Sequence, residues 1–225
     1  MPQLPLTLVP PRPRRFDNFV AGPNRALVAA LRHGIGEGQW LFLRGSPGSG
    51  KSHLAHAALQ DRREAGDSAC FVPGRDAAAR PLLERAEAAL AIVDDVDRLA
   101  GDPEAERALF NALNRWRAAR ASVLLTGRAV AAFELPDVAS RLGQTTRLAL
   151  EALDDAGIAV LVDRLIVEFG LVAGRGLRGY VLRHGPRAPA ALVELFEAIG
   201  RRAHAERRVA SVPLAREELD RLARR

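Results

Sequence analysis

The sequence predicts an α/β fold of the P-loop NTPase class, with a parallel sheet covered by helices on both faces and a small all-helical region after it. Three observations lead to this prediction. Residues 45–52 fit the phosphate-binding pattern Gly-x4-Gly-Lys-Ser/Thr in full. Short apolar runs that do not alternate with polar residues recur along the first two thirds of the chain, as in strands buried on both faces of a parallel sheet. After residue 152 these runs stop and helical periodicity takes over.

The chain opens with a proline-rich segment and then a helical stretch. Prolines are frequent in residues 1–15, where they oppose a helix and favour an extended chain, so we expect a tail outside the core. A helical region is expected between Asp17 and His33, with Leu27, Val28 and Leu31 on one face.

Strands and helices then alternate through the predicted sheet domain. Helical patterns fill three of the gaps between strands, whereas Pro73 and Pro81 interrupt the segment 73–88 and predict a short connection without a helix. The predicted strands are 40–43, 69–72, 90–93, 122–125 and 147–150, and the helices between them are 53–64, 104–119 and 137–142.

The pattern in the last part of the chain predicts four helices separated by glycine or proline. They are predicted at 154–169, 175–184, 188–206 and 214–224. We therefore expect a tail over 1–15, an α/β domain over 16–152 and a helical domain over 153–225.

Composition restricts the compartment and the class of partner. The single cysteine, Cys70, lies in an apolar run, so it excludes an intrachain disulfide and fits a buried thiol in a reducing compartment. No apolar run is long enough to span a bilayer and no secretion signal is visible, which favours a cytoplasmic protein without membrane contact. The net charge of +6 comes almost entirely from scattered arginines and forms no continuous stripe, so the sequence does not single out a nucleic-acid face.

Phosphate binding accounts for the residue types in this pattern. Its glycines allow a tight turn that brings backbone N–H groups against phosphate oxygens, and the following helix presents its positive dipole end. Lys51 would reach the β- and γ-phosphates, and the Ser52 hydroxyl would bind Mg²⁺. A plain Gly/Ser turn is the alternative, and the flanking strand and helix patterns disfavour it. The nucleotide-binding residues predicted here are Gly45, Pro47, Gly48, Ser49, Gly50, Lys51, Ser52 and His53.

Carboxylates end the third predicted strand. Asp94 would hold the hydration shell of Mg²⁺ beside Ser52, and Asp95 would orient or deprotonate a water. Thr126 ends the fourth strand, where its hydroxyl either contacts the γ-phosphate or the water, or only begins a turn before Gly127.

Four blocks of this chain resemble the ATPase module of the bacterial replication initiator DnaA, an AAA+ family. They are Phe16–Arg25, Gly50–Leu54, Asp94–Gly101 and Leu135–Leu142. The resemblance extends from about residue 16 to the end of the chain. It implies an AAA+ base domain of five parallel strands, a helical lid, and binding of ATP or ADP with Mg²⁺.

The resemblance also assigns two arginines. Arg141 matches the arginine finger, which projects toward the nucleotide of a neighbouring subunit. Its alternative is an exposed arginine capping a short helix. Arg187 matches the lid arginine that contacts bound nucleotide within one subunit, although its flanking prolines depart from the family pattern, and an ordinary surface arginine is the alternative.

Three departures make the chain more similar to the Hda family, the regulatory inactivators of DnaA. It ends after the lid, so we expect no helix-turn-helix DNA-binding domain, and the connection between the second and third strands is shorter than in the initiator. Its tail resembles the Gln-Leu-x-Leu peptide that docks on the sliding clamp, the DNA polymerase III beta subunit. The docking residues are Gln3, Leu4, Leu6 and Leu8.

The function that this resemblance implies is negative regulation of replication initiation. A clamp-docked protein would place Arg141 against ATP-bound DnaA and stimulate its hydrolysis, and DNA would be contacted through the clamp. The alternatives are a loader or adaptor that binds helicase or single-stranded DNA, a P-loop phosphotransferase for small molecules, and a nucleotide-stabilised scaffold without turnover. The Asp94–Asp95 pair is expected to support slow ATP hydrolysis by this chain, and homo-oligomer formation is compatible with the resemblance.

Overall fold

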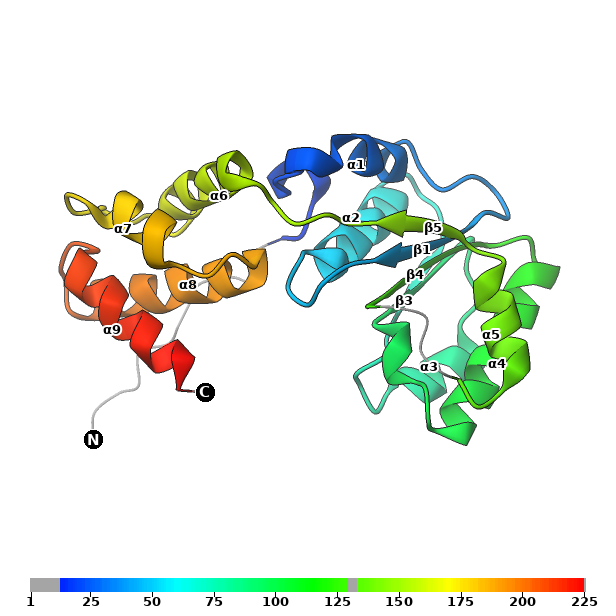
Figure 1. The fold of residues 1–225 in the computed structure, drawn as a ribbon. Helices are drawn as coiled ribbons and strands as arrows, with labels where there is room; N and C mark the ends of the chain where they lie inside the picture. The colour runs from blue at the N-terminus through cyan, green and yellow to red at the C-terminus, as the bar shows by residue number, and fades with distance from the viewer. Residues whose placement is uncertain (1–12, 129–132, 225) are drawn as a thin grey trace, which may run out of the picture.

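The computed structural model describes residues 13–128 and 133–224 and divides them into two lobes (Figure 1). One lobe is a sheet flanked by helices, and the other contains only helices. The predicted clamp-docking residues Gln3, Leu4, Leu6 and Leu8 lie outside the described residues.

The sheet is parallel and has five strands in the order β2-β3-β4-β1-β5. The strands predicted from apolar runs are confirmed, with ends displaced by one or two residues. The buried strands β1, β3 and β4 lie at its centre, which explains why their apolar runs do not alternate. The strands are β1 Trp40–Arg44, β2 Ala69–Pro73, β3 Leu90–Asp94, β4 Ser122–Gly127 and β5 Thr146–Ala149.

Alternate residues of each central strand belong to different cores. Phe42 packs into the core that also holds Trp116, whereas the next residue, Leu43, packs into the core that holds Leu54. This separation follows from the two-residue period of a strand. The helices that flank the sheet are α1 Arg25–Arg32, α2 Lys51–Glu64, α3 Ala79–Arg85, α4 Pro103–Ala118 and α5 Pro136–Gly143.

One local prediction was wrong, and the helical region expected between Asp17 and His33 forms only in part. The segment 73–88 contains the helix α3, because Pro81 occupies the first turn, where a backbone N–H has no helical partner to lose. The segment 17–33 is not one helix: the short 3-10 turns η1 Phe16–Asn18 and η2 Gly22–Asn24 precede α1, and Gly22 has a φ of +50° that a helix does not adopt.

The helical lobe confirms the predicted change of texture and has its own core. That core includes Leu165 of α6, Val181 of α7, Phe196 of α8 and Leu214 of α9. Its four helices are α6 Asp155–Glu168, α7 Leu177–His184, α8 Pro189–Ala205 and α9 Val212–Ala223. In the part of the chain that the structure describes, no helix combines the length and apolar character needed to cross a membrane.

Candidate functional site

The loop between β1 and α2 takes a shape that depends on its glycines. Gly48 and Gly50 have φ angles of +73° and +107°, in the region that side chains disfavour. A Cβ atom on Gly45 would lie 2.9 Å from Ser49 Oγ and 3.1 Å from the Leu150 carbonyl oxygen. Within the described residues, no side chain caps the amino end of α2, so its first turn is open to an anion.

Lys51 is buried at the start of α2 and folds back onto this loop. Its residue is only 5% exposed, and Nζ donates to the carbonyl oxygens of Gly45 at 2.9 Å and Ser46 at 3.0 Å. Burial lowers the pKa of Lys51, although the nearby carboxylates Asp95 and Asp94 partly oppose this change. The loop therefore encloses a cation whose charge is not fully compensated.

A hydrogen-bond chain joins the carboxyl ends of β3 and β4. The hydroxyl of Thr126, which is fully buried, donates to Asp94 Oδ1 at 2.5 Å and accepts from the Asp95 backbone N–H at 3.0 Å. Asp95 itself has a left-handed backbone, with φ at +52°. Thr126 thus holds both members of the acidic pair in place from the neighbouring strand.

The Asp95 carboxylate has a cationic partner that sequence reasoning missed. Arg75, in the loop after β2, donates from Nε to Asp95 Oδ2, whose side chain is only 12% exposed. Arg128, after β4, lies 3.7 Å from Asp97 by its Nε. No sequence motif distinguishes these two arginines from the many others. They come together here because β2 and β4 flank β3 in the sheet.

A cleft of about 980 Å³ runs along the phosphate loop and between the lobes. The amino end of α8 forms its other side, where the Ala190 backbone N–H donates to the Gly48 carbonyl oxygen at 3.0 Å. Leu161 and Val193 line the same side, and periodicity alone marked them as ordinary helical positions. The cleft also borders Pro47, Gly48, Ser49, Gly50, Lys51, Ser52, His53, Arg75, Asp95 and Arg128.

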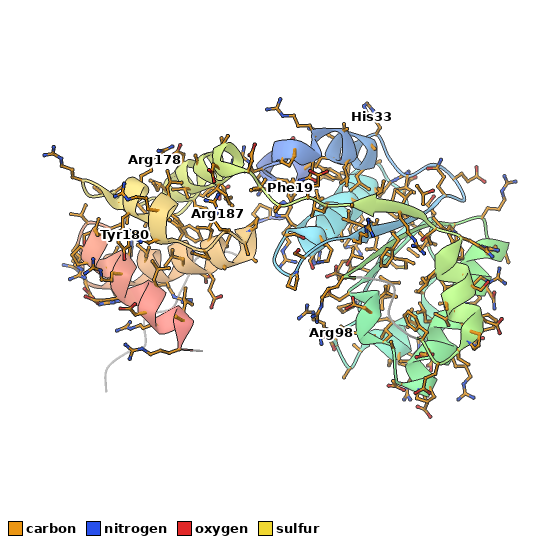
Figure 2. The ribbon with its side chains drawn as sticks, in the orientation of Figure 1. Phe19, His33, Arg98, Arg178, Tyr180 and Arg187 are labelled. Atoms are coloured by element: carbon orange, nitrogen blue, oxygen red, sulfur yellow. The ribbon has the colours of Figure 1, made fainter. Side chains whose placement is uncertain are left out.

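The segment before α1 packs over the phosphate loop. Phe19 lies between the two lobes (Figure 2), and a Cβ atom on Gly50 would come within 2.7 Å of its ring. The Phe19 ring also lies 5.3 Å from the His53 ring, between centroids. His53 Nε2 is 2.9 Å from the Arg15 carbonyl oxygen, which ties this segment to α2.

The side chains of the two arginines assigned by resemblance pair with residues outside the phosphate loop. Arg187, which Figure 2 labels in the helical lobe, precedes α8 and forms an ion pair with Asp155 of α6. Arg141 projects from α5 and donates from Nη2 to Asn114 Oδ1 of α4 at 3.0 Å. Neither is among the described residues that line the cleft, whereas the loop, Lys51 and Asp95 are brought together there.

Three solved structures with similar folds can be compared with this chain. The similarity to domain III of the Thermotoga maritima replication initiation protein DnaA has a TM-score of 0.79 at 16% identity, over 93% of this chain and 97% of that one. A replication initiator DnaA bound to AMPPCP and single-stranded DNA gives 0.69 at 19% identity, over 85% and 64%. The Thermotoga maritima RuvB Holliday junction branch migration motor gives 0.64 at 16% identity, over 93% and 72%.

The chain has the AAA+ P-loop fold. The five-stranded parallel sheet with its helical lobe superposes on these neighbours over most of the chain, which confirms the predicted fold class. No protein-family model matches the chain. The chain spans 64% of the DnaA that carries AMPPCP and single-stranded DNA, so the similarity concerns the fold of part of that protein.

The buried charge of Lys51 predicts a pH-dependent effect on stability. Burial lowers the Lys51 pKa below its ordinary value of 10.5, so between the lowered pKa and 10.5 the folded protein binds fewer protons than the unfolded chain. The parent's free energy of unfolding therefore rises with pH in this window relative to Lys51→Met, which carries no titrating group. Urea denaturation of both proteins from about pH 7 to about pH 10 measures the difference.

The matched control is Arg63→Met, at an exposed position of the same helix. Arginine does not titrate in this range, so the stability difference between this variant and the parent stays constant. If the stability difference between Lys51→Met and the parent is also constant with pH, the electrostatic cost assigned to burying Lys51 is wrong.

Proposed function

We propose that this chain is a nucleotide-binding AAA+ regulator of chromosomal replication initiation that acts in the cytoplasm. It binds ATP or ADP, docks on the sliding clamp, and uses Arg141 to stimulate ATP hydrolysis by the initiator DnaA. The observation that carries the proposal is the glycine-dependent phosphate loop around Lys51 beside the Asp94–Thr126 pair, within a fold shared with DnaA domain III.

In this proposal the chain has three functional units, which are a docking tail over 1–15, a base domain over 16–152 and a lid domain over 153–225. The separate cores support this division, since two cores cover the two faces of the sheet and a third fills the helical lobe. The cleft between base and lid then becomes the nucleotide site.

The residues present fit a nucleotide with Mg²⁺. The Ser49 hydroxyl is buried in the phosphate loop and has no hydrogen-bond partner among the described residues, as expected of a group that meets a phosphate. The backbone N–H groups of the loop and Lys51 would hold the phosphates. Ser52 and Asp94 would hold Mg²⁺, largely through water, and the ion would neutralise phosphate charge.

Slow hydrolysis by this chain itself is consistent with the position of Asp95. The Asp95 carboxylate borders the cleft, where it would orient a water, but Arg75 occupies one of its oxygens. Thr126 supports the site by holding Asp94 and the Asp95 backbone. The main role is therefore regulatory, with a weak ATPase activity.

Arg141 acts on a second molecule in this proposal. It lies outside its own cleft, on α5, and Asn114 restrains its guanidinium without an opposing carboxylate among the described ion pairs. A guanidinium presented in this way can stabilise charge that develops on the γ-phosphate of DnaA. Arg187 would approach this chain's own nucleotide only by leaving Asp155.

A loader or adaptor that binds single-stranded DNA is the second candidate. The DnaA neighbour bound to single-stranded DNA favours it. Strong, salt-dependent binding of this chain to single-stranded DNA without the clamp would support this alternative over the regulatory function.

Isothermal titration calorimetry tests the nucleotide site. We expect the parent to bind ATP and ADP with Mg²⁺, and Lys51→Met to bind about 100-fold more weakly, because charge-assisted hydrogen bonds to phosphate are lost. Arg63→Met should retain the parent affinity. If the folded parent retains neither nucleotide, the proposed function is wrong.

An assay of ATP hydrolysis by DnaA, with DNA-loaded clamp, tests the finger. We expect Arg141→Ala to lower the stimulation by about 10³-fold or more while clamp binding persists. Arg107→Ala, at an exposed position of α4, is the matched control and should stimulate like the parent. If Arg141→Ala stimulates ATP hydrolysis by DnaA as well as the parent does, Arg141 is not the arginine finger.

Retention on immobilised clamp tests the tail. The double variant Gln3→Ala/Leu4→Ala should be lost, because the peptide loses its amide contact and one apolar anchor. Pro10→Ala/Pro11→Ala, outside the docking residues, should be retained like the parent. If both double variants are retained equally, residues 1–15 have no docking role.

A further inference from the structure

Glu106 is a buried charge that the nucleotide site does not use. It is the fourth residue of α4 and is fully buried. Its carboxylate accepts backbone N–H groups from Gly101 at 2.9 Å, from Glu134 at 3.1 Å and from Leu135 at 2.8 Å. No cation lies within ion-pair distance of it among the described residues.

These contacts keep the carboxylate charged inside the protein. Burial by itself raises the pKa of Glu106, but the three backbone N–H donors outweigh it and hold this pKa below its ordinary value. Its place in the first turn of α4 adds the favourable dipole of that helix. An apolar side chain in the same place would leave these three backbone N–H groups without an acceptor, so the carboxylate is what holds them together.

The three donors come from two segments, one that precedes α4 and one that precedes α5. Gly101 ends the loop that follows the acidic pair of β3. Glu134 and Leu135 immediately precede α5, and Leu135 is the N-cap residue of that helix, with no cap from its own side chain. The carboxylate of Glu106 therefore joins the end of the acidic-strand loop to the start of α5.

The same helix α4 also holds the other end of α5. Asn114 lies eight residues after Glu106 on α4, which is about 12 Å along a helix, and it accepts the hydrogen bond from Arg141. The start of α5 and the guanidinium near its end are thus fixed to one rigid element. This arrangement limits rotation and sliding of α5 relative to the sheet.

We infer that Glu106 is a positioning residue for Arg141: its carboxylate fixes the start of α5 against the loop of the acidic strand, and so sets where the guanidinium is presented. The structural part of this inference concerns α5 alone. Its consequence for activity rests on the proposed role of Arg141 as a finger for DnaA.

Hydrogen exchange of the isolated protein tests the structural part. In Glu106→Gln one carboxylate oxygen becomes an amide that donates, so at least one of the three backbone N–H groups loses its acceptor. We expect amide exchange in residues 134–143 to become about 10-fold faster, because a charge-assisted hydrogen bond is lost, while residues 51–64 of α2 are unchanged. Glu104→Gln, at an exposed position two residues earlier in α4, should leave both regions at the parent rate.

Unchanged exchange in residues 134–143 of Glu106→Gln overturns the inference. An equal acceleration in α2 and α5 also overturns it, because it shows general destabilisation and not a local effect on α5.

The DnaA assay tests the consequence for activity. We expect Glu106→Gln to lower the stimulated rate at saturation by about 10-fold, while its affinity for nucleotide and its half-saturating concentration stay within about 2-fold of the parent. A loss of affinity without a change in the saturated rate would overturn the positioning role. If the parent itself does not stimulate DnaA, the proposed function fails, and hydrogen exchange alone decides whether Glu106 positions α5.

Discussion

The buried ammonium of Lys51 is the interaction on which the rest of the site depends. A charge at this depth is costly, and the carbonyl oxygens of Gly45 and Ser46, with the nearby carboxylates Asp95 and Asp94, only partly compensate it. The loop can turn these carbonyls toward Lys51 because Gly48 and Gly50 take positive φ angles. An anion bound in the same loop would offset the rest of the cost of burying the Lys51 ammonium. A phosphate group would have the charge to do this.

A different interaction positions the carboxylates at the carboxyl end of β3. Strand β4 lies between the phosphate-loop strand β1 and the acidic strand β3, and Thr126 is the residue of β4 that reaches across. Its hydroxyl both donates and accepts, which only a small polar side chain could do in this fully buried position. The result is an Asp94 carboxylate of fixed orientation beside a cationic loop.

The two lobes meet at the same loop. The backbone contact between Ala190 and Gly48 places the amino end of α8 against the phosphate loop, and the Phe19 ring packs over Gly50. A nucleotide in this cleft would touch the base, the lid and the segment before α1 at once. Occupancy of the cleft and the relative position of the lobes are therefore physically linked in the proposed function.

Local sequence determined the strands, most helices, the phosphate loop and the acidic pair, because each depends on periodicity or on glycine and carboxylate at fixed spacing. It failed where context overrides a local rule, since Pro81 is accepted in the first turn of α3. The helical region expected over 17–33 forms a regular helix only from Arg25 on, after the positive φ of Gly22. Only the tertiary structure decided that Arg75 pairs with Asp95 and that Glu106 receives three backbone N–H groups. Apart from Gly101, those partners are 20 or more residues away in the chain. Nothing in the sequence around an arginine or a glutamate shows which distant element will pack against it.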